Sequence, residues 1–157
     1  MGAEVVAVDT AREAVDGVEI AVTATTATEP VVLGEWIRAG MHINAVGSNW
    51  ANRQELDAGA VGRCDRVAVD DLAQAKEESG DLIAAAEVGV LAWDRVVELG
   101  LIVAGEVPGR TAPQETTLFE SQGIALEDVA AIKLAYDRAR QLGVGEELKK
   151  DVTSEGC

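Results

Sequence analysis

The sequence predicts an α/β fold, in which a parallel sheet of about four strands is flanked by helices and followed by a long C-terminal helix. Short β-branched, apolar runs alternate with segments of helical pattern between residues 4 and 80, and this alternation is typical of βαβ units. An apolar stripe of helical period between residues 125 and 139 predicts the long helix. Gly143 follows at the position where helices commonly end.

The predicted elements can be placed along the chain from these patterns. A first strand at residues 4–8 leads into a short helix, in which Thr10 and Glu13 have the spacing of a capping box and Gly17 marks the end. Further β-branched runs bounded by turn residues predict strands at 19–25, 42–46 and 66–70. The intervening segments predict helical turns or helices at 34–40, 53–61, 71–80 and 93–99.

The composition limits the classes of function open to the protein. The chain has 157 residues, with 13 basic against 28 acidic side chains and a net charge of −15, which argues against a nucleic-acid partner. No apolar run approaches the ~20 residues of a membrane span and no secretory leader pattern is present, which favours a cytoplasmic protein without a membrane partner. Two cysteines, Cys64 and Cys157, and the single His42 are too few for a disulfide scaffold or a metal site.

Ligands of parallel sheets bind at the carboxyl ends of the strands, and three polar segments follow predicted strands there. They are residues 23–28, 47–49 and 70–71. The threonines of the first segment can hydrogen-bond a ribose or phosphate, or they can serve as ordinary strand and turn residues. In the second segment, Gly47 allows the backbone to approach a ligand while Ser48 and Asn49 offer neutral polar groups, but the same three residues also suit a plain turn.

Other candidate residues have simpler interpretations. Arg110 follows Pro108 and Gly109 and could contact an anion, although single surface arginines are common. His42 opens a predicted strand, far from the carboxyl end, so we expect a structural role for it. The sequence contains neither of the glycine-rich phosphate loops, G-x-G-x-x-G or G-x-x-x-x-G-K-[ST], and no nucleophile elbow of the form G-x-S-x-G.

Two stretches, at residues 22–57 and 108–131, carry a family resemblance. They contain the segments INAVGSN and TLFESQGIALEDVA. Taken together and in this order, they resemble the ornithine cyclodeaminase/mu-crystallin family, which also includes bacterial and archaeal alanine dehydrogenases and ketimine reductases. The similarity extends from residue 2 to about residue 148.

The resemblance implies a Rossmann-type NAD(P)-binding domain together with a dimerisation domain built mainly from the N-terminal part of the family's longer chains. It implies that this chain begins after the first βαβ unit, which carries the glycine-rich loop, and so corresponds to the C-terminal half of a family member. We therefore expect a partial NAD(P)-binding region at 1–105, a C-terminal helical segment at 106–148 that packs on it and toward the dimerisation domain, and a polar tail at 149–157.

The resemblance also implies roles for individual residues. The positions that match cofactor contacts of the family are Thr25, Val46, Gly47, Ser48, Arg53 and Ser121. Asn49 falls at the position of the catalytic Asp of ornithine cyclodeaminases. A carboxamide does not take up a proton in the useful pH range, so the substitution affects lyase chemistry more than hydride transfer to or from an imine.

Three functions remain open on this basis. The parent protein is an NAD(P)-dependent amino-acid or imine oxidoreductase, an ornithine cyclodeaminase that releases proline and ammonia, or a non-catalytic, crystallin-like binding protein. The implied partners are NAD or NADP, a small amino-acid or imino-acid substrate and a second subunit of a homodimer. We expect the chain alone to be inactive and to bind the dinucleotide weakly or not at all, because the phosphate loop is missing.

The absent unit has a structural consequence in the Rossmann strand order. The strand at residues 4–8 would lose its neighbours, so we expect it to dock on a non-native partner strand or to be poorly ordered. The strand at 19–25 would expose an apolar edge.

Overall fold

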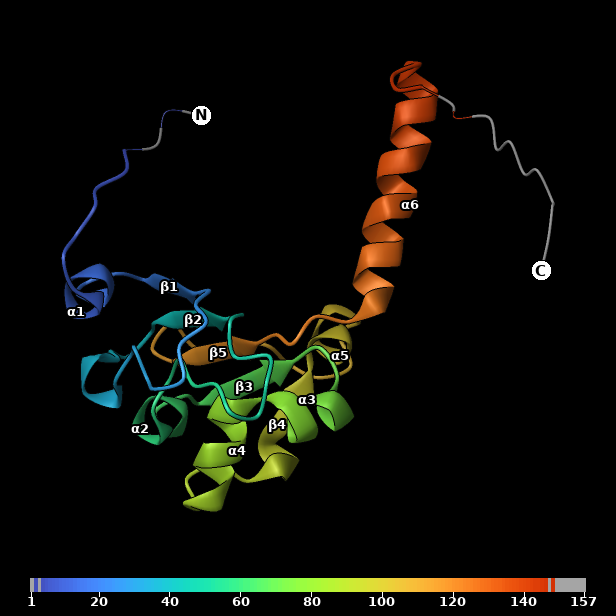
Figure 1. Ribbon diagram of the computed structural model, residues 1–157. Coiled ribbons are helices and arrows are strands. Elements are labelled where there is room, and N and C mark those ends of the chain that lie inside the picture. The colour runs from blue at the N-terminus through green and yellow to red at the C-terminus, as the bar shows by residue number, and fades with distance from the viewer. Residues whose placement is uncertain (1, 3, 147, 149–157) are drawn as a thin grey trace, which may run out of the picture. The chain divides into compact units, whose positions relative to one another are not determined.

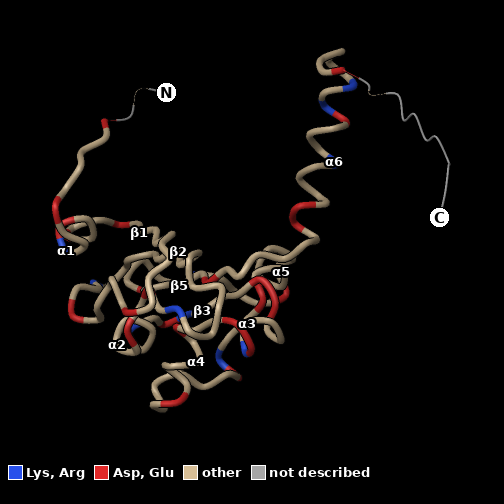
Figure 2. Tube along the Cα trace, viewed as in Figure 1, with Lys and Arg blue, Asp and Glu red and all other residues tan. Residues whose placement is uncertain are grey.

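The computed structural model of the protein describes residues 2, 4–146 and 148. The described chain divides into two compact units, one reaching to Gly123 and the other starting at Ile124 (Figure 1). The predicted polar tail at 149–157, with Cys157, lies outside the described residues. Figure 2 shows acidic residues spread over both units and comparatively few basic ones.

The first unit is built around a five-stranded parallel sheet in the order β1-β2-β5-β3-β4. Its strands are β1 (Ile20–Thr23), β2 (His42–Ala45), β3 (Arg66–Val69), β4 (Val96–Glu98) and β5 (Thr117–Glu120). The α/β class and the parallel arrangement are therefore confirmed, with one strand more than expected. β5, which comes last in the sequence, lies between β2 and β3 at the centre of the sheet.

Two segments that were predicted to be helical contain strands instead. Residues 93–99 form the short 3-10 helix η2 (Trp93–Arg95) followed by β4. β5 lies within the segment 106–148, which was expected to be helical. Both strands are only three or four residues long, and pairing with β3 and β2 rather than a local pattern makes them strands.

The remaining helices of this unit are short, and four of them begin with a side-chain cap. The remaining helices are α1 (Ala11–Val15), η1 (Gly34–Trp36), α2 (Ala58–Gly62), α3 (Leu72–Glu78), α4 (Gly80–Glu87) and α5 (Leu99–Val103). Thr10 and Glu13 form the predicted capping box of α1. α2 begins later than the predicted residue 53, because Asp57 caps it by accepting a hydrogen bond from the amide of Ala60 at 2.7 Å.

The hydrophobic core lies against one face of the sheet. Ile43 of β2 and Leu118 of β5 are buried there together with Leu56 and with Leu82 of α4. Figure 1 shows α2 and α4 on the same side of the strands. The opposite face is less covered, since Ile20 is 62% exposed. The edge strand β1 thus carries exposed apolar side chains, as expected.

The prediction of a strand at residues 4–8 is wrong. These residues have no strand pairing, and Val5 and Val6 are 90% and 72% exposed. They do not dock on a non-native strand either, because none of the described strands pairs with them. The nearest strand in the sequence, β1, is an edge strand that pairs with β2 alone among the described strands. A β-branched run alone does not form a strand unless a neighbour supplies hydrogen bonds.

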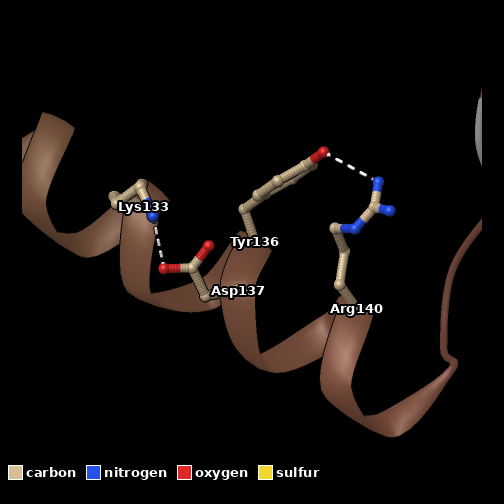
Figure 3. A network of polar contacts seen from close by, with 4 residues as sticks. All are labelled: Lys133, Tyr136, Asp137 and Arg140. Atoms are coloured by element: carbon tan, nitrogen blue, oxygen red, sulfur yellow. Dashed lines mark hydrogen bonds and ion pairs between the residues drawn. The ribbon is translucent and has the colours of Figure 1, made fainter.

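The second unit consists of α6 (Ala125–Leu142), the helix predicted from its apolar stripe. Gly143 ends it in the left-handed conformation, with φ of 64°. On its surface Lys133 pairs with Asp137, and Nη1 of Arg140 donates a hydrogen bond to the hydroxyl of Tyr136 at 3.2 Å (Figure 3). No helix among the described residues is long and apolar enough to cross a membrane.

Candidate functional site

The loop that follows β2 lies against the end of β1 at the carboxyl edge of the sheet. The amide of Val46 donates a hydrogen bond to the carbonyl of Thr23 at 2.9 Å, which continues the strand pairing into the loop. Val46 is 39% exposed and Ser48 is fully buried. Residues 46–49 therefore form a fixed turn beside the end of β1, where parallel sheets bind ligands.

A buried carboxylate that sequence reasoning did not single out holds this turn. Glu55 is fully buried and accepts three hydrogen bonds, from the hydroxyl of Thr23 at 2.8 Å, the amide of Thr25 at 2.5 Å and the amide of Gly47 at 2.8 Å. The three donors lie eight to 32 residues away from Glu55 in the chain. No local pattern reveals such a residue, since its role depends on contacts that only the fold creates.

Gly47 is required by the contact between the two strand ends. A Cβ atom at this position would lie 2.3 Å from the carbonyl oxygen of Thr25 and 2.4 Å from Oε1 of Glu55. Gly47 therefore allows the close approach of one backbone segment to another, rather than acting as an ordinary turn residue.

Asn49 and Arg53 are joined on the exposed side of the turn. Nη1 of Arg53 donates a hydrogen bond to Oδ1 of Asn49 at 3.3 Å, and the hydroxyl of Ser48 donates to the carbonyl of Arg53 at 2.9 Å. Arg53 lies in this turn and not in a helix. The guanidinium thus contacts the carboxamide of Asn49 on the exposed side of the turn.

Ser121 reaches the same edge from β5. Its amide donates to the carbonyl of Ala45 at 2.9 Å, so it lies beside the start of the 46–49 turn. Its hydroxyl donates to Oδ2 of Asp70 at 2.7 Å, and the amide of Gly123 donates to the same oxygen at 2.9 Å. Asp70, which follows β3, therefore orients the Ser121 hydroxyl.

Thr25 is exposed, but its polar groups have protein partners. The amide donates to Glu55, and Oγ1 accepts a hydrogen bond from the amide of Ala27 at 3.2 Å. The hydroxyl proton is still available to a ligand. The Thr25 and Gly47 amides are occupied by Glu55 and do not offer donors to a phosphate.

Two further buried carboxyl groups lie behind Glu55. Burial raises the pKa of Asp81 to about 7, against opposing hydrogen bonds from the amides of Leu56 and Glu55. Burial and the neighbouring Asp81 raise the pKa of Glu120 well above its ordinary value. Within the described chain, Asp81 Oδ2 and Glu120 Oε2 have no hydrogen-bond partner. In both groups burial therefore favours the protonated form over the charged form.

The structure brings Thr25, residues 46–49, Arg53 and Ser121 together at one edge and leaves His42 and Arg110 at the other. His42 Nδ1 lies 2.7 Å from the hydroxyl oxygen of Thr117, and Arg110 Nη1 donates to the carbonyl of Gly40 at 2.8 Å. These contacts agree with the structural role expected for His42. His42 and Arg110 line a cavity of about 620 Å³ at the amino ends of the strands.

The described residues contain no cluster of side chains suited to a metal ion.

Apart from the guanidinium of Arg53, the accessible groups named above at the carboxyl edge are neutral. Val46 supplies apolar surface, Asn49 a carboxamide and Thr25 a hydroxyl proton. An apolar patch with neutral hydrogen-bonding groups fits the nicotinamide end of a dinucleotide better than its phosphates. Those three residues, with Ser121, are the groups that could hold such a ring, whereas Ser48 is fully buried and its hydroxyl donates to the carbonyl of Arg53.

Comparison with known proteins shows the family of this chain. Residues 1–143 match the ornithine cyclodeaminase/mu-crystallin family. The chain belongs to this family. The family's relatives include a Delta(1)-pyrroline-2-carboxylate reductase of Bacillus cereus (strain ZK / E33L), which is 41% identical over 140 residues, or 88% of this chain and 43% of that protein.

Solved structures in the ornithine cyclodeaminase/mu-crystallin family share the fold. The Delta(1)-pyrroline-2-carboxylate reductase of Thermococcus litoralis, in complex with NADH and L-proline, aligns with a TM-score of 0.83 and 44% identity over 90% of this chain and 44% of that one. An archaeal alanine dehydrogenase dimer with bound NAD aligns with a TM-score of 0.79 and 36% identity over 92% and 44% of the two chains. The chain thus spans less than half the length of the relatives that it matches.

Proposed function

We propose that the chain forms the nicotinamide-facing part of an NAD(P)-dependent oxidoreductase that interconverts amino acids and the corresponding imines. The observation that carries this proposal is the turn at residues 46–49, tied by Glu55 to the end of β1. It provides an apolar edge with neutral hydrogen-bonding groups beside the guanidinium of Arg53, in a family whose relatives include an imine reductase and an amino-acid dehydrogenase.

Each residue at this edge has a definite task in the proposed reaction. Thr25 and Ser121 hold the cofactor, together with the apolar surface of Val46 and the backbone of Gly47, while the buried Ser48 fixes the turn through its hydrogen bond to the carbonyl of Arg53. The nicotinamide, when bound, supplies or accepts the hydride. The protein contributes position, and the order imposed on these groups by Glu55 and Asp70 supports such a role.

Asn49 orients the substrate rather than exchanging a proton with it. Its carboxamide is held by Arg53 and can hydrogen-bond an amine, an imine or a water molecule. It cannot act as a general acid or base at neutral pH. This argues against ornithine cyclodeamination, which would need another proton carrier at this position.

The partners follow from the same proposal. We infer a small amino-acid or imino-acid substrate, because the relatives include a pyrroline-carboxylate reductase and an alanine dehydrogenase. We also propose a homodimer, since that alanine dehydrogenase is a dimer. A cytoplasmic location remains a prediction from the sequence.

A chimaeric enzyme tests the proposal. The segment of the Thermococcus litoralis reductase that precedes its region of similarity would be joined to residues 2–146 of this chain. The assay is NADH- and NADPH-dependent reduction of Delta(1)-pyrroline-2-carboxylate, with the complete reductase as positive control. Turnover by the chimaera, lost when its phosphate loop is mutated, supports the proposal. A folded chimaera without turnover on this substrate or on other cyclic imines contradicts it and favours a non-catalytic binding protein.

A further inference from the structure

Glu55 has an unusual set of partners for a buried carboxylate. It is fully buried, yet no lysine or arginine of the described residues forms an ion pair with it. Its partners are two backbone amides and one hydroxyl, at 2.5 to 2.8 Å. Burying a charge without a counterion is costly, whereas an apolar side chain could fill the same volume.

The partners of Glu55 come from two different strand ends. Thr23 and Thr25 belong to the end of β1, while Gly47 belongs to the turn after β2. The carboxylate therefore fixes the spacing between these segments. Because Gly47 has no side chain, the two segments can lie in direct contact. A Cβ atom at this position would overlap the carbonyl oxygen of Thr25.

Glu55 is itself held from behind. Its amide donates to Oδ1 of Asp81 at 2.8 Å, and its carbonyl accepts hydrogen bonds from the amides of Val31 and Val32 at 2.8 and 2.9 Å. A carboxylate whose own backbone has three hydrogen bonds is a rigid anchor. The groups that it fixes adjoin the exposed side chains of Thr25 and Val46.

We propose that Glu55 is the positioning residue of the cofactor site. Its carboxylate clamps the Gly47 turn to the end of β1, so that Thr25 and Val46 keep the spacing needed to contact a nicotinamide ring. The cofactor part of this inference rests on the function proposed above, whereas the clamp itself can be tested without it. Glu55 acts through other residues and does not touch the reacting atoms.

The first experiment measures amide hydrogen exchange by NMR in the chain itself. Glu55→Gln keeps the shape but replaces one acceptor by a donor, so the Thr25 or Gly47 amide loses its partner. We expect the exchange of at least one of these amides to accelerate by about tenfold or more. Glu77→Gln, an exposed site on α3, is the matched control and leaves both amides unchanged. Unchanged exchange at both amides in Glu55→Gln would overturn the clamp.

A second pair of variants covers the case in which Glu55→Gln does not fold. Thr23→Val removes only the hydroxyl that donates to Oε2 of Glu55, whereas Thr23→Ser keeps a hydroxyl there. We expect faster exchange of the Gly47 amide, which shares Oε2, in the valine variant and wild-type exchange in the serine variant. Equal exchange in the two variants counts against the clamp.

The second experiment titrates millimolar NADH into the same variants and follows the amide resonances of Thr25, Val46 and Ser48. We expect shifts in the wild type and in Glu77→Gln, and about tenfold weaker binding in Thr23→Val and Glu55→Gln. Faster exchange without weaker binding overturns the positioning role. A wild-type chain that shows no shifts contradicts the cofactor part of the inference for this chain, whereas the chimaera decides the proposed function and the exchange data decide the clamp.

Discussion

The fully buried carboxylate of Asp81 accepts a hydrogen bond from the backbone amide of Glu55 at 2.8 Å. Asp81 belongs to the first turn of α4, so this bond ties a helix to the residue that organises the carboxyl edge. Burial raises the pKa of Asp81 to about 7. The protonation state of Asp81 near neutral pH is therefore coupled to the stability of the fold around the candidate site.

We expect Asp81 to make the protein less stable as the pH rises. The pKa of Asp81 is about 7 in the folded state, compared with 3.8 for the free side chain. The stabilising contribution of the protonated side chain is therefore complete below the pKa of the free side chain, and it is lost progressively as the pH rises to the pKa of the folded state. The difference in unfolding free energy between wild type and Asp81→Asn should change by up to ~1.4 kcal/mol per pH unit in this window. Chemical denaturation at a series of pH values measures it. Parallel pH profiles of the two proteins would contradict the prediction.

Gly47→Ala should destabilise the first unit. The added methyl would lie 2.3 Å from the carbonyl oxygen of Thr25, and we expect a loss of about 1–3 kcal/mol in unfolding free energy. Gly62→Ala is the matched control, because a Cβ there lies 3.4 Å from Val90 in ordinary contact and Ala favours the helix. Equal stability of the two variants would show that the strand ends are not in close contact.

Ser121→Ala should lower stability by about 1 kcal/mol. The substitution removes the hydroxyl that donates to Oδ2 of Asp70, whose other oxygen has no partner among the described residues. Thr28→Ala, at an exposed position, should change stability by less than about 0.5 kcal/mol. Thermal unfolding of both variants checks the difference, and an unchanged melting temperature in Ser121→Ala refutes the proposed bond.

Cys64 should resist thiol reagents in the folded protein. Burial raises its pKa to about 12, and its thiol donates to the carbonyl of Ala60 at 3.3 Å, so little reactive thiolate is present near neutral pH. In a Cys157→Ser variant, where Cys64 is the remaining cysteine, labelling by iodoacetamide should be slow before unfolding and fast in denaturant. Similar labelling rates in both conditions would show that Cys64 is accessible.

Local patterns predicted those parts of the fold that depend on neighbours in sequence. The Thr10 capping box, the Gly143 end of the long helix and three of the parallel strands follow from side chains within a few residues of one another. β4 and β5 could not be predicted from local patterns, because strands of three and four residues acquire their conformation from distant partners. The strand predicted at residues 4–8 failed for the converse reason, since it finds no partner.

The candidate site shows the same division. The turn containing Gly47 and Asn49 could be found from its composition and its place after a strand. Glu55 could not, because its bond to Thr23 spans 32 residues and its position in sequence suggested an ordinary helix start. Asp81 and Glu120 were also missed, since nothing in a chain with 28 acidic residues distinguishes a buried carboxyl group.

The most direct measurement is an NMR titration of the chain with NADH. If the carboxyl edge of the sheet faces the nicotinamide, saturable shifts should appear at Thr25, at residues 46–48 and at Ser121, even though binding is weak. The amides around His42 and Arg110, at the opposite edge, should not move. Shifts confined to that opposite edge would contradict the assignment of the cofactor site to residues 46–49 and their neighbours.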